Sequence, residues 1–259
     1  MEAVLITGGG SGIGAATAAW LTACGTDVLV CGRREAALQR IAAATGCAWT
    51  VADCTDEEQV AAAVEATVHR FGRLTGVVAA AGTMSSGTVL DTTPEVWAQC
   101  LASNATSAFL TARAALPHLL ATQGRLVLVS SIAALRSSNG SAAYAAAKAA
   151  VVSLGQAIAV ECGPQGVRAN VVCPGWVRTE MADAEMDDFA IDRDAGYAEV
   201  TGLVPQRRPA EAAEVAAAIG WLLGPESSYV NGTVLTVDGG TTTVDAGTVP
   251  FDFRVTPRE

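Results

Sequence analysis

Short apolar runs alternate with longer helical segments along most of the chain. The runs are rich in β-branched residues and occupy 3–6, 27–31, 48–51, 76–79, 126–129, 167–172 and 233–237. Runs of this kind are typical of parallel strands that are buried on both faces. The segments between them include 15–24, 94–118 and 210–223, which are rich in alanine and leucine and predict helices. The alternation therefore predicts an α/β fold with helices packed on a parallel sheet.

Residues 1–259 are predicted to form one domain, because no charged or Pro/Ser-rich linker divides the alternation. A long segment of mixed character, 180–205, follows the sixth run, a position where such segments commonly form a lid over a substrate. A tail, 241–259, extends beyond the last run. Its alternating apolar positions are Val249, Phe251, Phe253 and Val255. This stripe predicts packing across a subunit boundary or over a neighbouring active site.

The charge balance restricts the partners of the chain. It has 16 basic and 26 acidic residues, a net charge of −10, which disfavours nucleic acid and anionic membrane. The seven cysteines show no C-x-x-C spacing, and the chain begins with a strand rather than a signal peptide, so we expect reduced thiols in a cytoplasmic protein. The chain has no run of eighteen strongly apolar, uncharged residues, so no membrane span is predicted.

Metal-dependent and hydrolytic chemistry find little support. Neither of the two histidines, His69 and His118, lies near another ligand type, which argues against zinc or a Ser-His-Asp hydrolase. The six carboxylates within 180–192 lack ligand spacing and are interpreted as a solvated face. No metal site is predicted.

The first run leads directly into the turn T-G-G-G-S-G-I-G at 7–14 and then into a helix. Glycines at this junction allow the backbone to approach a pyrophosphate closely, and the helix N-terminus supplies amide donors. A dinucleotide site is therefore predicted here, formed by Gly8, Ser11, Gly12, Ile13 and Gly14.

The next strand ends extend the predicted site, because dinucleotide folds contact the cofactor from these positions. The residues concerned are Arg33 and Arg34 after the second run, Asp53 and Cys54 after the third, and Ala80 and Gly82 after the fourth. Asp53 has an alternative role as the cap of the helix that starts after Thr55.

The fifth run delivers Ser130 and Ser131 to its carboxyl end, where open α/β sheets bind ligands. The Ala-rich segment that follows predicts a helix with Ser141 as its N-cap, which places Tyr144 and Lys148 one turn apart on one face. An ammonium about 5 Å from a phenol oxygen would lower the phenol pKa by about 2 units. That shift would move the tyrosine toward the range in which general acid/base catalysis works best.

The pattern Y-x-x-x-K also occurs by accident on exposed helices. Lys148, though, is the only lysine in a chain whose other basic residues are all arginines. Its compact ammonium can donate to a ribose hydroxyl and approach a phenol, which a planar guanidinium cannot do equally well. We therefore interpret Ser131, Tyr144 and Lys148 as a catalytic set. Asn104 stands among apolar neighbours, and a lone amide there is often a satisfied core group.

Three features together resemble the short-chain dehydrogenase/reductase family: the glycine-rich turn, a serine thirteen residues before Y-x-x-x-K, and C-P-G-W-V-R-T at 173–179. The similarity covers residues 3–240 in the family's order. It implies a Rossmann-type, doubly wound sheet of seven parallel strands in the order 3-2-1-4-5-6-7, flanked by helices. It also implies NAD(H) or NADP(H) as cofactor and a homotetramer.

The resemblance implies roles for individual residues. Ser131 would hold the substrate oxygen and Tyr144 would exchange its proton. Lys148 would bind the nicotinamide ribose and lower the tyrosine pKa, and Asn104 would anchor a water in the proton relay. Further cofactor contacts are implied at Pro174, Gly175, Val177 and Thr179.

One departure from the family stands at Ala79-Ala80-Ala81-Gly82, where relatives commonly carry N-N-A-G. The asparagine of that pattern usually braces the central strands. Its absence puts one structural hydrogen bond in question and leaves the chemistry intact.

Two functions fit these observations. The favoured one is an NAD(P)-dependent oxidoreductase that moves hydride between nicotinamide and a ketone or secondary alcohol, with Tyr144 as general acid/base. The alternative is a catalytically silent sensor or scaffold that binds the nucleotide. Only Met84, Trp176 and the lid hint at an apolar substrate pocket.

Cofactor choice depends on the end of the second run. Gly32 stands where NAD-preferring relatives carry aspartate, and Arg33 and Arg34 follow it. A 2′-phosphate needs that carboxylate absent and a cation nearby, so NADP(H) is favoured. NAD(H) stays possible, because Ser11 is not the basic residue that many NADP-preferring relatives have.

Overall fold

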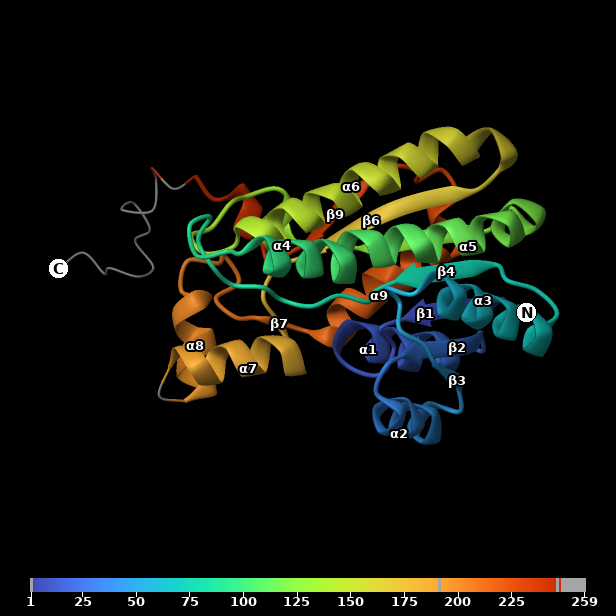
Figure 1. Ribbon diagram of the computed structural model, residues 1–259, viewed down its shortest axis with the longest axis horizontal. Helices are drawn as coiled ribbons and strands as arrows, with labels where there is room; N and C mark the ends of the chain where they lie inside the picture. Colours follow the sequence, from blue (N-terminus) through green and yellow to red (C-terminus); the bar gives the residue numbers. More distant parts are fainter. Residues whose placement is uncertain (1, 191, 246, 248–259) are drawn as a thin grey trace.

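The computed structural model describes residues 2–190, 192–245 and 247, which form a parallel sheet with helices on both faces (Figure 1). The strands of the sheet are β1 (Ala3–Thr7), β2 (Asp27–Gly32), β3 (Ala48–Val51), β4 (Gly76–Ala79), β5 (Arg125–Val129), β6 (Arg168–Pro174) and β9 (Val234–Val237). Their order is β3-β2-β1-β4-β5-β6-β9, and every pair is parallel. The predicted order is confirmed. The seventh strand is labelled β9 because a separate ladder of β7 (Val177–Arg178) and β8 (Ala210–Glu211) precedes it.

Both faces of the central strands β1, β4, β5 and β6 are buried, which explains their continuous apolar runs. Successive side chains point to opposite faces, so that Leu5 and Leu126 belong to one core cluster and Val4 and Val127 to the other. The first cluster includes side chains of α3, α5 and α6, and the second those of α1, α2 and α9. The bounds of these helices are Gly12–Ala23 (α1), Glu35–Thr45 (α2), Glu57–Phe71 (α3), Ser107–Thr122 (α5), Ala142–Cys162 (α6) and Ala212–Leu223 (α9).

The predicted helix 94–118 is interrupted by a π-helical turn. α4 (Pro94–Leu101) and α5 are joined by Ala102–Thr106, whose hydrogen bonds span five residues. Sequence periodicity did not reveal the turn, because one extra residue in a single turn barely changes the apolar pattern. Ser141 occupies the N-cap position of α6, but its hydroxyl donates to the Ser138 carbonyl and makes no cap bond. The predicted N-cap position of Ser141 is confirmed, although its side chain makes no cap bond.

Among the described residues, one stretch, 142–165, is long and apolar enough to cross a membrane by length and composition alone. It comprises α6 and the short turn after it. Val151, Ile158 and Ala159 pack from this helix into the first core cluster. A helix that lies against the central sheet explains the hydropathy without a membrane.

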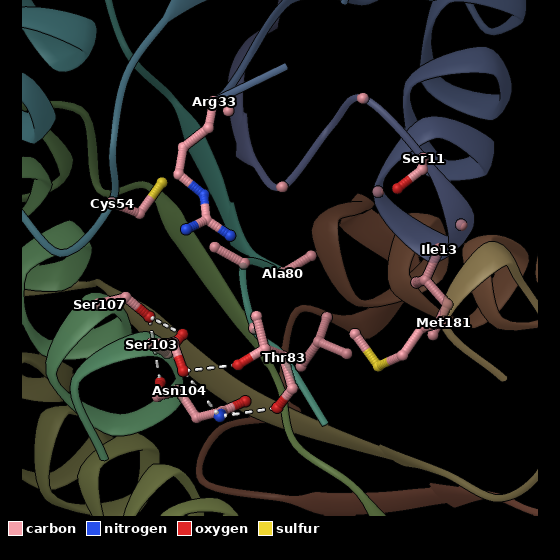
Figure 2. A pocket seen from close by; sticks show the side chains of 18 of the residues that line it. Ser11, Ile13, Arg33, Cys54, Ala80, Thr83, Ser103, Asn104, Ser107 and Met181 are labelled. Carbon is pink, nitrogen blue, oxygen red and sulfur yellow. Dashed lines mark hydrogen bonds between the residues drawn. The ribbon is translucent and has the colours of Figure 1, made fainter. Parts of the chain in front are cut away.

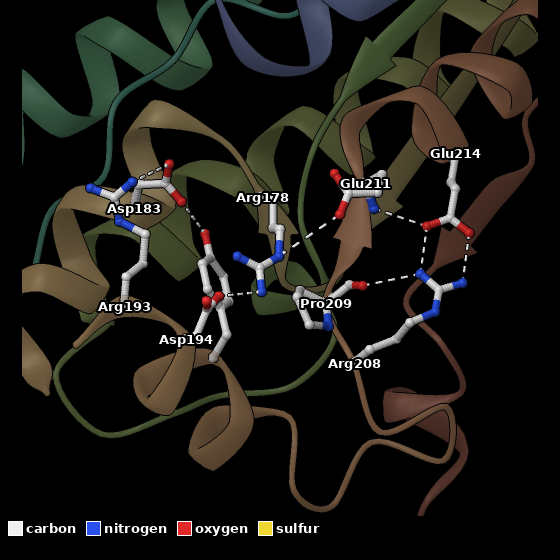
Figure 3. Close-up of polar contacts among 9 residues, drawn as sticks. Arg178, Asp183, Arg193, Asp194, Arg208, Pro209, Glu211 and Glu214 are labelled. Carbon is white, nitrogen blue, oxygen red and sulfur yellow. Dashed lines mark hydrogen bonds and ion pairs between the residues drawn. The ribbon is translucent and has the colours of Figure 1, made fainter.

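The segment 180–205 forms two helices, α7 (Glu180–Phe189) and α8 (Arg193–Val200), which pack on each other to one side of the sheet (Figure 1). Its carboxylates are not simply a solvated face. Arg193 pairs with Asp183 at 3.1 Å (Figure 3) and with Asp187 at 2.6 Å. The hydroxyl of Tyr197 donates to Asp183 at 2.8 Å. These contacts join α7 to α8 as one unit.

The tail carries a prediction that the structure leaves open. Val249, Phe251, Phe253 and Val255 lie outside the described residues. The part of the tail that is described begins with a 3-10 turn, Thr241–Thr243, and Arg136 donates to the Thr242 carbonyl at 2.7 Å. The start of the tail is therefore attached to the loop before α6.

Candidate active site

A cleft of about 270 Å³ opens along the carboxyl ends of β1 to β5 (Figure 2). It brings together most of the residues that the sequence singles out. Those that line it are Gly8, Ser11, Gly12, Ile13, Gly14, Arg33, Arg34, Asp53, Cys54, Ala80, Gly82, Asn104, Tyr144, Lys148 and Thr179. The cleft lies where open α/β sheets bind their ligands.

The glycine-rich turn is shaped for close approach. Gly8 has φ +69°, and a Cβ there would lie 2.8 Å from the Ala80 carbonyl oxygen. A Cβ on Gly14 would collide with the Gly8 backbone. Helix α1 starts at Gly12 and presents its amide groups to the cleft, which favours a bound phosphate. The residues present therefore fit a dinucleotide.

The two arginines after β2 point in different directions. Arg33 extends into the cleft between Cys54 and Ala80 (Figure 2). Arg34 donates to the Ser11 hydroxyl at 2.8 Å and pairs with Glu180 of α7 at 2.7 Å. Arg34 thus joins the glycine-rich turn to the first turn of α7.

Asp53 does not cap α3, so that alternative is wrong. The cap is Asp56, whose carboxylate accepts from Glu58 N at 2.9 Å and Gln59 N at 3.1 Å. Asp53 instead accepts from the backbone and side chain of Thr55. These bonds and the charge of Arg33 hold the pKa of Asp53 below its usual value. An ionised acceptor therefore lies at the wall of the cleft.

Thr7 makes a hydrogen bond to the segment where relatives commonly carry N-N-A-G. Its Oγ1 accepts from Ala81 N at 3.4 Å, which ties the end of β1 to the segment after β4. The alanines at 79–81 leave that strand end without bulky side chains. A hydrogen bond therefore still joins this segment to the neighbouring strand β1.

Asn104 is held on the π-helical turn. Its amide nitrogen donates to the carbonyls of Thr83 and Cys100, both at 3.0 Å. Its Oδ1 is buried and has no hydrogen-bond partner among the described residues. A Cβ on Gly82 would lie 2.6 Å from this oxygen and 3.2 Å from Lys148 Nζ, so both atoms flank Gly82. An unpaired acceptor next to a lysine is suited to accept a hydrogen bond from a water molecule or from a hydroxyl group of a ligand.

Tyr144 and Lys148 face the same cleft, but burial dominates their electrostatics. Burial raises the pKa of Tyr144 to about 12, against a hydrogen bond from the Ser131 side chain that lowers it. Burial lowers the pKa of Lys148 to about 8. The expected depression of the phenol pKa is thus wrong for the protein chain alone. Lys148 Nζ donates to the Val129 carbonyl at 3.2 Å and lies 5.5 Å from the phenol ring centroid.

Six predicted site residues do not line the cleft. Trp176 lines a separate cavity of about 300 Å³ together with Arg208 and Asp238. Met84 is partly exposed, and Ser131 follows Ser130, which lines the cleft. The remaining three are Pro174, Gly175 and Val177.

The cleft also contains residues that sequence reasoning missed. Thr83 and Ser103 share a hydrogen bond of 2.7 Å, and Ser107 donates to the Ser103 carbonyl at 2.8 Å (Figure 2). Met181 of α7 lines the opposite side. The spacing of 103 and 107 by one helical turn would have indicated a shared polar face.

The part of the chain that the structure describes contains no candidate metal site. No group of three or more His, Cys, Asp or Glu side chains there is arranged to hold an ion.

Comparison with known proteins defines the class. Residues 8–242 match the family model described as enoyl-(acyl carrier protein) reductase. The chain is 37% identical to "Protein MoaE" of Klebsiella aerogenes, over 92% of this chain and 94% of that protein. It is 34% identical to meso-2,3-butanediol dehydrogenase of Serratia marcescens, over the same shares.

Solved structures of similar fold support the same class of protein. The fold superposes on levodione reductase with a TM-score of 0.88 at 34% identity, covering 94% of this chain and 98% of that one. An actinorhodin polyketide ketoreductase crystallised with NADPH gives the same TM-score and coverage at 28% identity.

The chain belongs to the short-chain dehydrogenase/reductase family. It is an NAD(P)-dependent oxidoreductase, of the class that transfers hydride between a nicotinamide cofactor and an alcohol or ketone. None of the comparisons supports the silent sensor or scaffold.

Proposed function

We propose that Tyr144 is the general acid/base of this oxidoreductase, that Ser131 orients the substrate oxygen, and that Lys148 and Asn104 complete the proton relay. The assignment rests on the buried Oδ1 of Asn104, which has no hydrogen-bond partner among the described residues. This oxygen and Lys148 Nζ both flank Gly82, in the cleft that Tyr144 also lines. Ordinary core packing gives no reason to bury an unpaired acceptor beside the chain's only lysine.

Each of these residues has a separate role in the proposed reaction. A bound nicotinamide supplies the hydride chemistry. The Tyr144 hydroxyl gives a proton to the substrate oxygen in reduction and takes it back in oxidation. Ser131 holds the same oxygen, because its side chain is close enough to the phenol to lower the pKa of Tyr144. Lys148 stabilises the phenolate when charged, and Asn104 Oδ1 holds the water that returns a proton to the lysine.

We assign the pyrophosphate to the turn at 8–14 and the adenosine end to Arg33, Asp53 and Cys54. NADP(H) is the preferred cofactor in this proposal, because Arg33 points into the cleft and Arg34 lies at its rim beside Ser11. Both guanidinium groups are within the part of the site where a 2′-phosphate would lie. Pro174, Gly175 and Val177 keep their proposed contacts at the nicotinamide end, next to Thr179.

The proposed substrate is a small ketone or secondary alcohol, enclosed by the lid at 180–205. Met84 and Trp176 remain proposed substrate contacts, although neither lines the cleft. We also propose a cytoplasmic homotetramer that binds neither nucleic acid nor membrane. Exposed apolar side chains on α4, α5 and α6 support the assembly; they are Trp97, Phe109 and Val160. The tail 241–259 is assigned to the same single domain.

The decisive experiment is a panel of ketones and secondary alcohols with NADPH, NADH and their oxidised forms. Turnover that is abolished in Tyr144→Phe supports the assignment. Cofactor binding without turnover of any compound would favour a silent nucleotide-binding protein.

A further inference from the structure

Two hydrogen bonds tie the residue after Gly82 to the π-helical turn (Figure 2). The backbone carbonyl of Thr83 accepts from Asn104 Nδ2 at 3.0 Å, and the Thr83 hydroxyl lies 2.7 Å from the Ser103 hydroxyl. All three residues line the cleft, and Thr83 and Ser103 are partly buried there. The proposed reaction uses Asn104 but gives the two hydroxyls no role.

Oxygen atoms surround the nitrogen end of the Asn104 amide. Its two protons go to the carbonyls of Thr83 and Cys100, both at 3.0 Å, and Ser103 Oγ lies 3.3 Å from the same nitrogen. A carbonyl oxygen can only accept a hydrogen bond, so a reversed amide would place Oδ1 against two acceptors. Of the three oxygens, only Ser103 Oγ carries a proton that could bind a reversed Oδ1. The direction of that proton therefore bears on which end of the amide faces Lys148.

Thr83 and Gln99 keep the Ser103 proton away from the amide. The serine hydroxyl lies 2.9 Å from the Gln99 carbonyl oxygen and 2.7 Å from the Thr83 hydroxyl, and both are nearer than Nδ2. Either the serine donates to Gln99 and accepts from Thr83, or it donates to Thr83. In both arrangements Ser103 presents a lone pair to Asn104. The amide nitrogen therefore stays on this side, and Oδ1 is left on the side of Lys148.

The hydroxyl pair also fixes the spacing of the proposed relay. A Cβ on Gly82 would lie 2.6 Å from Asn104 Oδ1 and 3.2 Å from Lys148 Nζ, so both atoms border the same small space. Thr83 follows Gly82 directly, and its two bonds to the π-helical turn hold this end of the strand against the amide. Loss of the hydroxyl bond would remove one of the two.

We propose that the hydroxyl pair of Thr83 and Ser103 positions Asn104 for the proton relay. The pair holds the amide oxygen toward Lys148, where a water molecule can bind. Thr83 and Ser103 are therefore positioning residues, which act through Asn104 and not on the reacting oxygen. The inference rests on the proposed function, because the orientation of Asn104 affects turnover only if the amide belongs to the relay.

Removal of either hydroxyl tests the proposal, with the substrate and cofactor that the compound panel identifies. Thr83→Val and Ser103→Ala should each lower kcat by about threefold to tenfold, the effect of one hydrogen bond, while KM and cofactor Kd change by less than about twofold. The double variant should be no slower than the slower single variant, because both changes remove the same bond. Thr83→Ser keeps a hydroxyl and should stay within about twofold of wild type.

The solvent deuterium isotope effect on kcat separates positioning from a structural role. A slower proton relay should raise the isotope effect of Thr83→Val above that of wild type. A loss of folded protein would lower kcat and leave the isotope effect unchanged. The control is Thr92→Val, which removes a hydroxyl that donates to the Thr88 carbonyl at 2.7 Å, away from the residues that line the cleft. It should keep the kcat and the isotope effect of wild type.

An unchanged kcat in Thr83→Val would overturn the inference. So would a lower kcat with an unchanged isotope effect, or a loss confined to KM or cofactor Kd, which would indicate direct contact with a ligand. Asn104→Ala separates this inference from the relay itself. If Asn104→Ala is inactive and Thr83→Val is fully active, the relay stands and only the positioning role fails. If Asn104→Ala keeps wild-type turnover, the relay assignment is wrong and the positioning role fails with it.

Crystal structures decide the matter if no compound is turned over. Wild type with oxidised cofactor should show a water molecule bound to Asn104 Oδ1. In Thr83→Val the amide should be reversed or shifted, and that water should be lost or displaced. An amide and a water that keep their places in Thr83→Val would overturn the inference.

Discussion

Lys148 Nζ lies 5.5 Å from the centroid of the Tyr144 ring and donates its hydrogen bond to the Val129 carbonyl rather than to the phenol. Ser130 fixes this geometry, because its hydroxyl donates to the Lys148 carbonyl at 2.8 Å. Burial disfavours the charged form of both side chains. The pair is therefore held in place by β5 before any molecule is bound, at a cost in folding free energy.

Lys148→Met should stabilise the fold while abolishing turnover. The folded-state pKa of Lys148 is lowered from 10.5 to about 8, so the unfolded chain binds more protons between those values. The free energy of unfolding of wild type should thus rise with pH through that window, and the full penalty applies below about pH 8. Removing the ammonium should add roughly 1–3 kcal/mol at pH 7, or a few degrees in Tm. Denaturant titrations at pH 7 and pH 10 measure both effects. If Lys148→Met were less stable than wild type, or if its free energy of unfolding rose with pH as much as that of wild type, the assigned cost of burying Lys148 would be contradicted.

Tyr144→Phe should reduce kcat by about a hundredfold or more, because the proton transfer loses its donor. Lys148→Arg should also lose most turnover although the charge is kept, since a guanidinium fork cannot occupy the place of an ammonium beside Val129 and Gly82. Cofactor affinity of Tyr144→Phe, measured by fluorescence titration, serves as the control for folding. Turnover within a few-fold of wild type in either variant would refute the relay.

Arg33→Ala should lower the preference for NADPH over NADH. A charge-assisted bond from this arginine to the 2′-phosphate would favour NADPH by roughly tenfold to a hundredfold in kcat/KM. Arg40→Ala, which removes an exposed arginine from α2, is the matched control and should change nothing. A wild-type preference for NADH, or an NADPH preference that Arg33→Ala leaves intact, would exclude the role.

Glu180→Gln should tighten NADPH binding by up to about fivefold without affecting NADH. The carboxylate holds Arg34 at 2.7 Å in an exposed pair, and such pairs contribute about 0–1 kcal/mol. Releasing the guanidinium would make it available to a phosphate beside Ser11. Calorimetry with both reduced cofactors measures the change, and equal effects on the two would show that Arg34 does not meet the 2′-phosphate.

The strands and the cleft could be predicted because each depends on local patterns, whereas the order of the strands came from the family resemblance alone. The apolar runs locate the strands, and residues directly after them, such as Arg33 and Gly82, must meet at one edge of the sheet. The pKa of Tyr144 could not be predicted, since the desolvation of a phenol depends on all elements packed around it. Neither could the position of Trp176, which lines a separate cavity although Thr179, three residues later, lines the cleft. The pairing of Asp183 with Arg193 depends on how two helices dock, which a list of carboxylates does not reveal.

The π-helical turn at Ala102–Thr106 sets the rotational phase between α4 and α5. Each residue of a regular helix advances the direction of its side chain by about 100°. Deletion of one residue in this turn would restore α-helical geometry and swing Asn104 away from Gly82, while most core contacts of α5 could be kept. The amide that we propose for the proton relay is thus coupled to the length of a helix rather than to its packing, so a single-residue insertion or deletion here would move it without disturbing the rest of the fold.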